Sequence, residues 1–433
     1  MSYCSLFFLM CEILSQIYKR VQSAMWLTIT VVIGSIVACR GVYNFAYSLE
    51  ELYSNCERTG RKNETIVCYN MTDIISWSGL HPFAFKAASN LDIVGTVEGV
   101  RARLHPVSYN EMSNFIRIRI RKINLDSLGP RSFHRLNNLE KIHLIDTGIR
   151  VIENNAFSSL PKLEQVLFIG NKITFFKYEI FFGCPMLKLL DFSNNQINET
   201  TDMVFDILGT LSFIRHINLS NNRINSSFKK VSNIYPDYDR IRSLWYAHNK
   251  FTELRVGWFR LRKKLEIINF AYNEIEYIEE NTFNNNPNLH TIILSYNKLI
   301  TIPITMIPAN FYPNLKYLAM DHNLIMGLDT SKQGPFRLLT NLKKITLAGN
   351  PFYCSCLNEV LNQIKHLNIQ QVCSEEEHTR DICIAEEENF NTPCHLISAN
   401  ESAQNRDDFI RENSAYPISF DPMYCVVEEF IIP

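Results

Sequence analysis

Apolar residues recur along most of the chain at a fixed interval. Residues 265–275 read "LEIINFAYNEI", and 24 residues later residues 289–299 read "LHTIILSYNKL". Both segments place apolar side chains at the first, fourth, sixth and eleventh positions and asparagine at the ninth. Such a period predicts units that cannot bury their apolar edge alone and therefore stack on one another. Copies of the pattern begin at Phe115, Leu139, Leu163, Leu187, Ile214, Ile241, Leu265, Leu289, Leu315 and Leu342.

The start of each copy predicts a short strand with its Leu-type residues pointing inward, because successive strand residues face opposite sides. The ninth-position asparagines predict a ladder of buried amides. Buried amides need hydrogen-bond partners, so we expect them to bond the backbone of neighbouring turns. The ladder residues are Asn171, Asn195, Asn222, Asn249, Asn273, Asn297, Asn323 and Asn350.

A second apolar column lies eighteen residues after the repeat start. It consists of Phe133, Phe157, Phe181, Phe205, Phe259 and Phe283. We expect these rings to stack as an aromatic spine beneath the convex side. Three residues further, Cys184 takes the position that leucine takes at Leu136, Leu160 and Leu208. This position predicts a buried free thiol rather than a reactive one.

These motifs resemble the extracellular, 24-residue type of leucine-rich repeat protein, over residues 91–353, with a degenerate first copy expected from Leu91. The resemblance implies an α/β solenoid, a right-handed arc with a parallel sheet on its concave side. An open solenoid exposes its core at both ends, so caps are expected there. Cys56 and Cys68 stand twelve residues apart within 40–90, as a small N-terminal disulfide cap requires.

After the last repeat, "NPFYCSC" resembles the C-terminal flanking cap of secreted and receptor leucine-rich repeat proteins, here expected at 354–396. In that family the first two cysteines pair with two downstream cysteines. The resemblance therefore implies the bridges Cys354–Cys373 and Cys356–Cys394. The Cys-x-Cys spacing also allows zinc, but no second ligand pair fits, so disulfides are favoured and no metal is expected.

Two further cysteines fall outside that four-cysteine pattern. Cys383 and Cys425 either pair with each other or leave one cysteine to bridge a second chain. The tail, residues 397–433, shows no heptad repeat and is expected to lie against the cap.

The N-terminal segment predicts export. Residues 21–39 read "VQSAMWLTITVVIGSIVAC" after two basic residues. This run is typical of a cleaved signal peptide, and it also reaches the length of a signal anchor, which would tether an extracellular body. Residues 1–39 are therefore expected to be either a signal peptide or a signal anchor. Six Asn-x-Ser/Thr sequons follow and fit a glycosylating, oxidising route. They begin at Asn63, Asn70, Asn198, Asn218, Asn225 and Asn400.

Composition is that of an ordinary globular chain. The 433 residues have a formal net charge of -1, which indicates neither nucleic acid nor an acidic membrane as a partner. No P-loop, GxSxG, HExxH or paired-carboxylate spacing is present, so we expect no enzyme, no catalytic residue and no cofactor.

The strand residues that face outward predict two surfaces on the concave side. Alternating arginines at Arg117, Arg119 and Arg121 could dock an acidic partner or be a solvated face. Aromatic residues in the middle of the arc either anchor a partner or pack laterally on one another. They are Trp245, His248, Tyr272, Tyr296, Tyr317 and His322.

The leading hypothesis is an extracellular recognition module that binds a protein on its concave face. The repeats and cap resemble insect Toll-ectodomain-like proteins and the mosquito leucine-rich immune molecules, in a form without the coiled coil. That resemblance implies another leucine-rich repeat chain or a complement-like thioester protein as partner. The alternative is a membrane-anchored adhesion or receptor component.

Overall fold

The computed structural model describes residues 56–59, 64–69, 88–95, 114–176, 178–181, 183–198, 213–226, 240–260, 262–306, 314–327 and 339–371. Several predicted features lie outside these residues. They are the segment 1–39, the tail 397–433, Phe205, Leu208, the sequons at Asn63, Asn70 and Asn400, and the cysteines Cys373, Cys383, Cys394 and Cys425.

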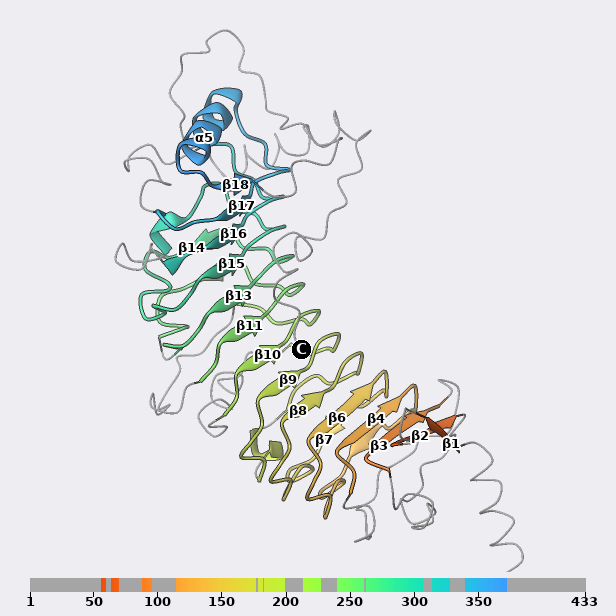
Figure 1. The fold of residues 1–433 in the computed structure, drawn as a ribbon. Helices are drawn as coiled ribbons and strands as arrows, with labels where there is room; N and C mark the ends of the chain where they lie inside the picture. The colour runs from red at the N-terminus through yellow and green to blue at the C-terminus, as the bar shows by residue number, and fades with distance from the viewer. Residues whose placement is uncertain are drawn as a thin grey trace, which may run out of the picture.

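One sheet runs the whole length of a curved arc (Figure 1), and its strands follow one another in chain order. All neighbours pair in parallel except β1 and β2, which are antiparallel. The strands are β1 (Cys56–Thr59), β2 (Thr65–Tyr69), β3 (Asn90–Val94), β4 (Arg117–Arg121), β6 (Lys141–Ile145), β8 (Gln165–Leu167), β9 (Leu189–Asp191), β10 (His216–Asn218), β11 (Ser243–Trp245), β13 (Ile267–Asn269), β15 (Thr291–Ile293), β16 (Tyr317–Ala319), β17 (Lys344–Thr346) and β18 (Gln370–Gln371).

Short elements occupy the return path of several coils. Two small parallel sheets join β5 (Ser127–Leu128) to β7 (Val151–Ile152) and β12 (Glu253–Leu254) to β14 (Tyr277–Ile278). In two other coils the described return path contains a 3-10 helix, η3 (Tyr178–Phe181) or η5 (Ile304–Met306). Each coil is therefore one strand and one irregular return.

The strand register follows the predicted repeat except at its start. Ile118 pairs with Ile142 and Ile142 with Val166, so equivalent inward positions stack. Leu91, however, pairs with Ile118, the fourth residue of its copy. The first copy therefore starts at buried Ala88 rather than at Leu91. Alanine carries too little apolar surface to stand out in the sequence pattern, which explains the shift.

The predicted asparagine ladder is present, and all eight of its side chains are buried. Asn297 shows the bonding of one rung. Its Nδ2 donates to the carbonyl of Phe270 in the preceding turn at 2.8 Å, and its Oδ1 accepts the N–H of Ile275 at 2.9 Å. Each amide thus satisfies backbone groups that the short strands leave unpaired, and it ties one coil to the next.

The predicted phenylalanine spine is also confirmed among the described residues. Phe157 is fully buried between Phe133 and Phe181, with ring centroids 5.4 Å apart on both sides. Further along, Phe259 and Phe283 stack at 5.2 Å. The stacked rings fill the side of the core that lies opposite the sheet.

Cys184 is a buried free thiol, as its leucine-like position predicts. Its Sγ lies 3.0 Å from the carbonyl oxygen of Phe157. Burial raises the pKa of the Cys184 thiol to about 12, so the reactive thiolate is scarce at neutral pH.

Two later copies place polar residues in that same leucine position. Arg262 stands there in one coil, only 2% exposed, and buried Asn286 stands there in the next. Asn286 donates to the carbonyl of Arg262 at 2.8 Å. Burial raises the pKa of nearby Tyr246, and the positive charge of Arg262 opposes that rise. The charged Arg262 side chain inside an apolar column departs from the repeat pattern, and the sequence periodicity does not predict it.

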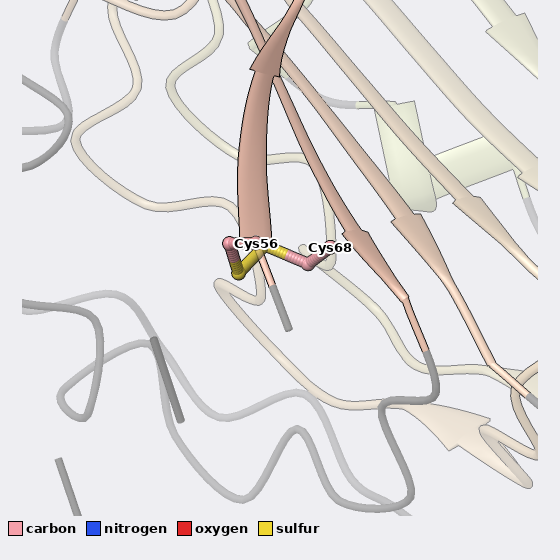
Figure 2. The surroundings of a disulfide bond; sticks show 2 residues. All are labelled: Cys56 and Cys68. Atoms are coloured by element: carbon pink, nitrogen blue, oxygen red, sulfur yellow. A yellow bond between two sulfur atoms is a disulfide. The ribbon is translucent and has the colours of Figure 1, made fainter. Parts of the chain in front are cut away.

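The N-terminal end of the core is closed by a disulfide-linked hairpin. Figure 2 shows Cys56 on β1 joined to Cys68 on β2, and the two residues are also register partners. Cys68 is buried at an inward position next to Ile93 of β3. The bridge thus fastens the antiparallel edge strand over the first parallel strand.

The C-terminal end is closed by helix α5 (Cys354–His366). Its buried residues Cys356, Leu357, Val360 and Ile364 form one stripe against the last coil. The helix ends in a Schellman motif, because Asn368 has a φ of 54° and the N–H of Ile369 reaches the carbonyl of Ile364. Cys356 is disulfide-bonded, and its partner lies outside the described side chains.

Candidate functional site

A stack of aromatic rings stands just past the ends of four neighbouring strands. The rings of His248 and Tyr272 have centroids 4.0 Å apart and planes within 10°. Tyr272 and Tyr296 follow at 4.2 Å and 13°, and Tyr296 and His322 at 4.1 Å and 4°. We call these four side chains the aromatic ladder. They come from the turns after β11, β13, β15 and β16, so the ladder crosses four coils.

The backbone at every ladder residue is left-handed. The φ angles are 54° at His248, 54° at Tyr272, 56° at Tyr296 and 55° at His322. The equivalent position is Lys122 in one coil and Asp146 in the next, and both are also left-handed. Four other coils fill it with glycine or asparagine, the residues that adopt this conformation most easily. Those residues are Gly170, Asn194, Asn221 and Gly349. A bulky residue there costs on the order of 1 to 3 kcal/mol, and such strain gathers at functional sites.

The ladder ends at Gly349 on one side. The Cβ atom of any other residue at this position would lie 2.7 Å from Cδ2 of His322. The φ of Gly349 is also positive, at 68°. Glycine therefore lets the His322 ring lie flat on the backbone of the next coil, between Tyr296 and that backbone.

Buried polar groups fix the orientation of the last ring. Nδ1 of His322 lies 3.1 Å from Oδ2 of Asp321. Ser295 donates to Oδ1 of the same carboxylate at 2.6 Å, and Thr346 donates to it as well. Asp321 is thus held from three coils, and it holds the imidazole in one position. The fixed imidazole therefore gives the Tyr296 ring a constant surface to stack on.

An apolar layer separate from the main core lies beside the ladder on the concave sheet. Ile267 and Tyr272 pack against its edge. We call this layer the concave floor. It consists of Trp245, Ala247, Ala271, Ile293, Tyr317 and Ala319. Three of its members are alanines, and these small residues allow the large rings to lie down across neighbouring strands.

Of the two alternatives for the six aromatic residues, lateral packing describes three of them. Trp245 is 4% exposed, and Tyr317 and His322 are each 8% exposed. Each of the three side chains is covered by residues from adjacent coils, so lateral packing accounts for them. Tyr272 and Tyr296 are half-buried and His248 is exposed. The accessible part of the aromatic surface is therefore the ladder without its last ring.

The basic end of the concave face is partly neutralised. Arg119 and Arg121 both bind Oδ2 of Asp92, at 2.5 Å and 3.1 Å. Asp92 is buried on β3, next to β4, which carries the arginines. Two of the three arginines considered for a docking or solvated surface are therefore paired with a buried carboxylate. Asp92 belongs to the coil whose start the sequence pattern misplaced, so its position facing the arginines was missed.

Low pH should weaken this end of the molecule through His143. Burial lowers the pKa of His143 to about 4; a hydrogen bond to Gln165 opposes the shift, and the charges of Arg117, Arg119 and Lys141 add to it. An unfolded histidine has a pKa of about 6.5. Between pH 6.5 and 4 the unfolded chain binds a proton that the folded chain does not, so stability falls as pH falls.

The measurement is the urea midpoint of wild type and His143→Gln over this pH range. We expect the wild-type midpoint to fall more steeply than that of the variant. Parallel curves would show that His143 is not held neutral by the fold.

Within the described residues, no group of three His, Cys, Asp or Glu side chains could hold a metal ion. None of the helices in that part of the chain has the length and apolar character that crossing a bilayer requires. The aromatic ladder contains no residue from a P-loop, GxSxG or HExxH motif.

Two family models match the repeats. A leucine rich repeat model matches residues 240–299, and a model of the BspA type leucine rich repeat region, with six copies, matches residues 103–235. The chain is thus a leucine-rich repeat solenoid with a parallel sheet and an N-terminal disulfide cap. A search among curated proteins finds no sequence match.

Solved structures share the fold at low sequence identity. A chain of the TLR13–ssRNA13 complex is 20% identical, with a TM-score of 0.50, over 63% of this chain and 42% of that one. A chain of the mouse RP105/MD-1 complex is 17% identical, with a TM-score of 0.54, over 74% and 55%. A chain of the octameric complex of Latrophilin 3, Unc5D and FLRT2 is 16% identical, with a TM-score of 0.50, over 76% and 95%.

The chain therefore spans about half of the length of the first two structures, at 42% and 55%. At these identities the similarity shows the fold and leaves the partner to be argued from the surface.

Proposed function

We propose that this protein is an extracellular recognition module that binds a protein partner on its concave face, with the aromatic ladder as the central contact. The observation that carries the proposal is the four-ring stack held in left-handed backbone. Asparagine or glycine would serve the fold there at lower cost, as Asn194, Asn221 and Gly349 do in other coils. Lys122 and Asp146 are left-handed at the same position, but only these four coils place stacked aromatic rings there, and that stack supports a role beyond folding.

The chemistry of the ladder fits a protein surface. Tyrosine combines a rigid apolar ring with a polar hydroxyl group, and such residues carry much of the binding energy of protein interfaces. Tyr272 and Tyr296 are half-buried by the stack, which leaves part of each ring accessible while its orientation is fixed. The adjoining concave floor keeps water away from one side of the stack.

One observation supports an extracellular location. The Cys56–Cys68 disulfide closes one end of the core, and structural disulfides persist in oxidising compartments.

The choice of a protein as partner is supported by two of the fold relatives, which come from protein assemblies, RP105 with MD-1 and FLRT2 with Latrophilin 3 and Unc5D. The complex of TLR13 with ssRNA13 is the contrasting case. In this chain two arginines of the basic end are paired with Asp92, which disfavours nucleic acid.

The test replaces Tyr272 and Tyr296 together by asparagine, which accepts the left-handed conformation. The wild-type chain is screened as a multivalent probe against an array of secreted proteins and receptor ectodomains, and each hit is measured by surface plasmon resonance. Loss of two interface tyrosines should weaken binding about tenfold or more, since each hot-spot residue contributes about 1 to 2 kcal/mol or more. Thermal melting should stay close to that of wild type.

Tyr277→Asn is the matched control. Tyr277 is a 52% exposed tyrosine on β14, outside the concave sheet. Its replacement should leave binding unchanged. If this control abolishes binding and the double variant does not, the contact surface lies on another side of the arc.

The narrower role that we propose is innate-immune recognition, with another leucine-rich repeat chain or a complement-like thioester protein as partner. Support comes from the repeat and cap architecture.

Expression in insect cells followed by comparison of medium and membranes distinguishes a cleaved signal from an anchor at residues 21–39. A band at twice the monomer mass on non-reducing gels would point to a bridge through Cys383 or Cys425.

A further inference from the structure

The asparagines of three sequons lie among the described residues, and their surroundings differ sharply. Asn198 and Asn225 are exposed and occupy equivalent positions on consecutive coils. Each follows a buried isoleucine, Ile197 or Ile224, whose N–H is bonded by the asparagine ladder of the next coil. Because the preceding residue is fixed inward, both asparagine side chains point away from the core.

Asn218 is the third sequon asparagine and is the last residue of β10 on the concave face. Its Nδ2 donates to Oδ2 of Asp191 at 3.0 Å, and its Oδ1 accepts the N–H of Ser220 at 3.0 Å. Ser220, which completes the sequon, is itself buried. Both ends of the Asn218 amide are therefore engaged within the sheet.

Asn218 is half-buried, and buried side chains flank it on both neighbouring strands. Its register partners are Asp191 on β9 and Trp245 on β11, and both are buried. Burial raises the pKa of Asp191, while its hydrogen bonds to Ser193 and Asn218 oppose that rise. A carbohydrate on Asn218 would disturb the side-chain donor of a buried carboxylate and would have to lie across the concave floor.

We propose that Asn198 and Asn225 carry N-linked glycans and that Asn218 does not, so that carbohydrate lines one edge of the arc and the concave sheet stays bare. In the transfer, the asparagine Nδ2 forms a bond to C1 of an oligosaccharide carried on a lipid diphosphate. The C1–O bond breaks, the lipid diphosphate leaves with the electron pair, and one amide proton is released. This inference rests on the proposed extracellular location.

The two glycans would stand one coil apart, beside the coil in which the aromatic ladder begins. Asn225 is bridged to Lys250, two residues after His248, the first ring of the ladder. A large partner should therefore approach the ladder from the C-terminal coils, and the glycosylated edge should not serve as a contact between two copies of the chain.

The experiment is intact mass spectrometry of secreted full chain from glycosylating insect cells, before and after removal of N-glycans. Asn198→Gln and Asn225→Gln should each lose the mass of one glycan. Ser220→Ala removes the third sequon while keeping the Asn218 side chain, and its mass should differ from wild type only by the substitution. Peptide mapping of deamidated sites assigns each glycan.

Each outcome decides a different point. A glycan on Asn218, or bare Asn198 and Asn225 in a chain that is glycosylated at Asn63, Asn70 or Asn400, overturns this inference and leaves export intact. A chain without any glycan that stays inside the cell overturns the extracellular proposal as well.

Discussion

Replacing Phe157 by alanine should lower the free energy of unfolding by about 3 to 5 kcal/mol, the usual loss for a large aromatic residue removed from a core. Phe157 is fully buried, stacks on Phe133 and Phe181, and meets Phe168 edge-on at 5.8 Å. The cavity would open in the middle of a stacked column, where rigid neighbours on both sides cannot easily collapse into it. Urea unfolding followed by circular dichroism measures the effect.

Phe175→Ala is the matched control for that variant. Phe175 is 44% exposed and belongs to the next coil. Its loss should change stability by about 0.5 kcal/mol or less. Equal effects of the two substitutions would show that the spine is not the stabilising element. Hydrogen exchange should further show that the loss in Phe157→Ala spreads to the adjacent coils, because each coil is stabilised mainly by its neighbours.

Replacing Asn297 by alanine should cost about 2 to 6 kcal/mol, since it leaves two or more buried backbone groups without partners at about 1 to 3 kcal/mol each. The two groups in the preceding turn are the carbonyl of Phe270 and the N–H of Ile275. The rung would break between two coils, so we expect a broadened or biphasic urea transition rather than a simple shift.

Asn284→Ala tests whether this cost comes from the rung. Asn284 is an exposed asparagine on the return path of the preceding coil and does not belong to the asparagine ladder. It should unfold like wild type. A small loss of unfolding free energy in Asn297→Ala would mean that water enters the gap and satisfies the freed backbone groups. The asparagine ladder would then fix the register of the coils without adding much stability.

Much of the fold can be predicted from the sequence because successive coils make the same contacts. Phe157 and Asn297 belong to columns in which every member has the same surroundings, so spacing alone indicates their burial. The start of the first copy is harder to locate in the sequence. This residue, Ala88, is small, and Asp92 on β3 therefore went unnoticed as the partner of Arg119 and Arg121.

The candidate site was predicted in position but not in detail. Spacing places Trp245 and Tyr317 on the concave side, yet it cannot tell whether a side chain stands up from the sheet or lies across it. That choice depends on the size of residues in neighbouring coils, here the alanines Ala247, Ala271 and Ala319. A signal for the aromatic ladder existed in the sequence: four successive coils have an aromatic residue directly before the ninth-position asparagine, where the other coils have glycine, asparagine, Asp146 or Lys122.

The burial of Arg262 cannot be predicted from the sequence periodicity. A periodic pattern predicts an apolar side chain at its position, and the structure places a buried guanidinium group there near Tyr246. Only the three-dimensional packing of adjacent coils shows how that charge is enclosed.

The spacing of the aromatic ladder has a mechanical consequence. Neighbouring strands in a sheet lie about 4.7 to 4.9 Å apart, whereas the ladder rings are only 4.0 to 4.2 Å apart. The rings converge because they stand on the inner side of the curve. Any straightening of the arc would pull them out of contact, so the stack resists bending in that direction. The ladder thus sets the local curvature of the arc and stiffens the four coils that carry it.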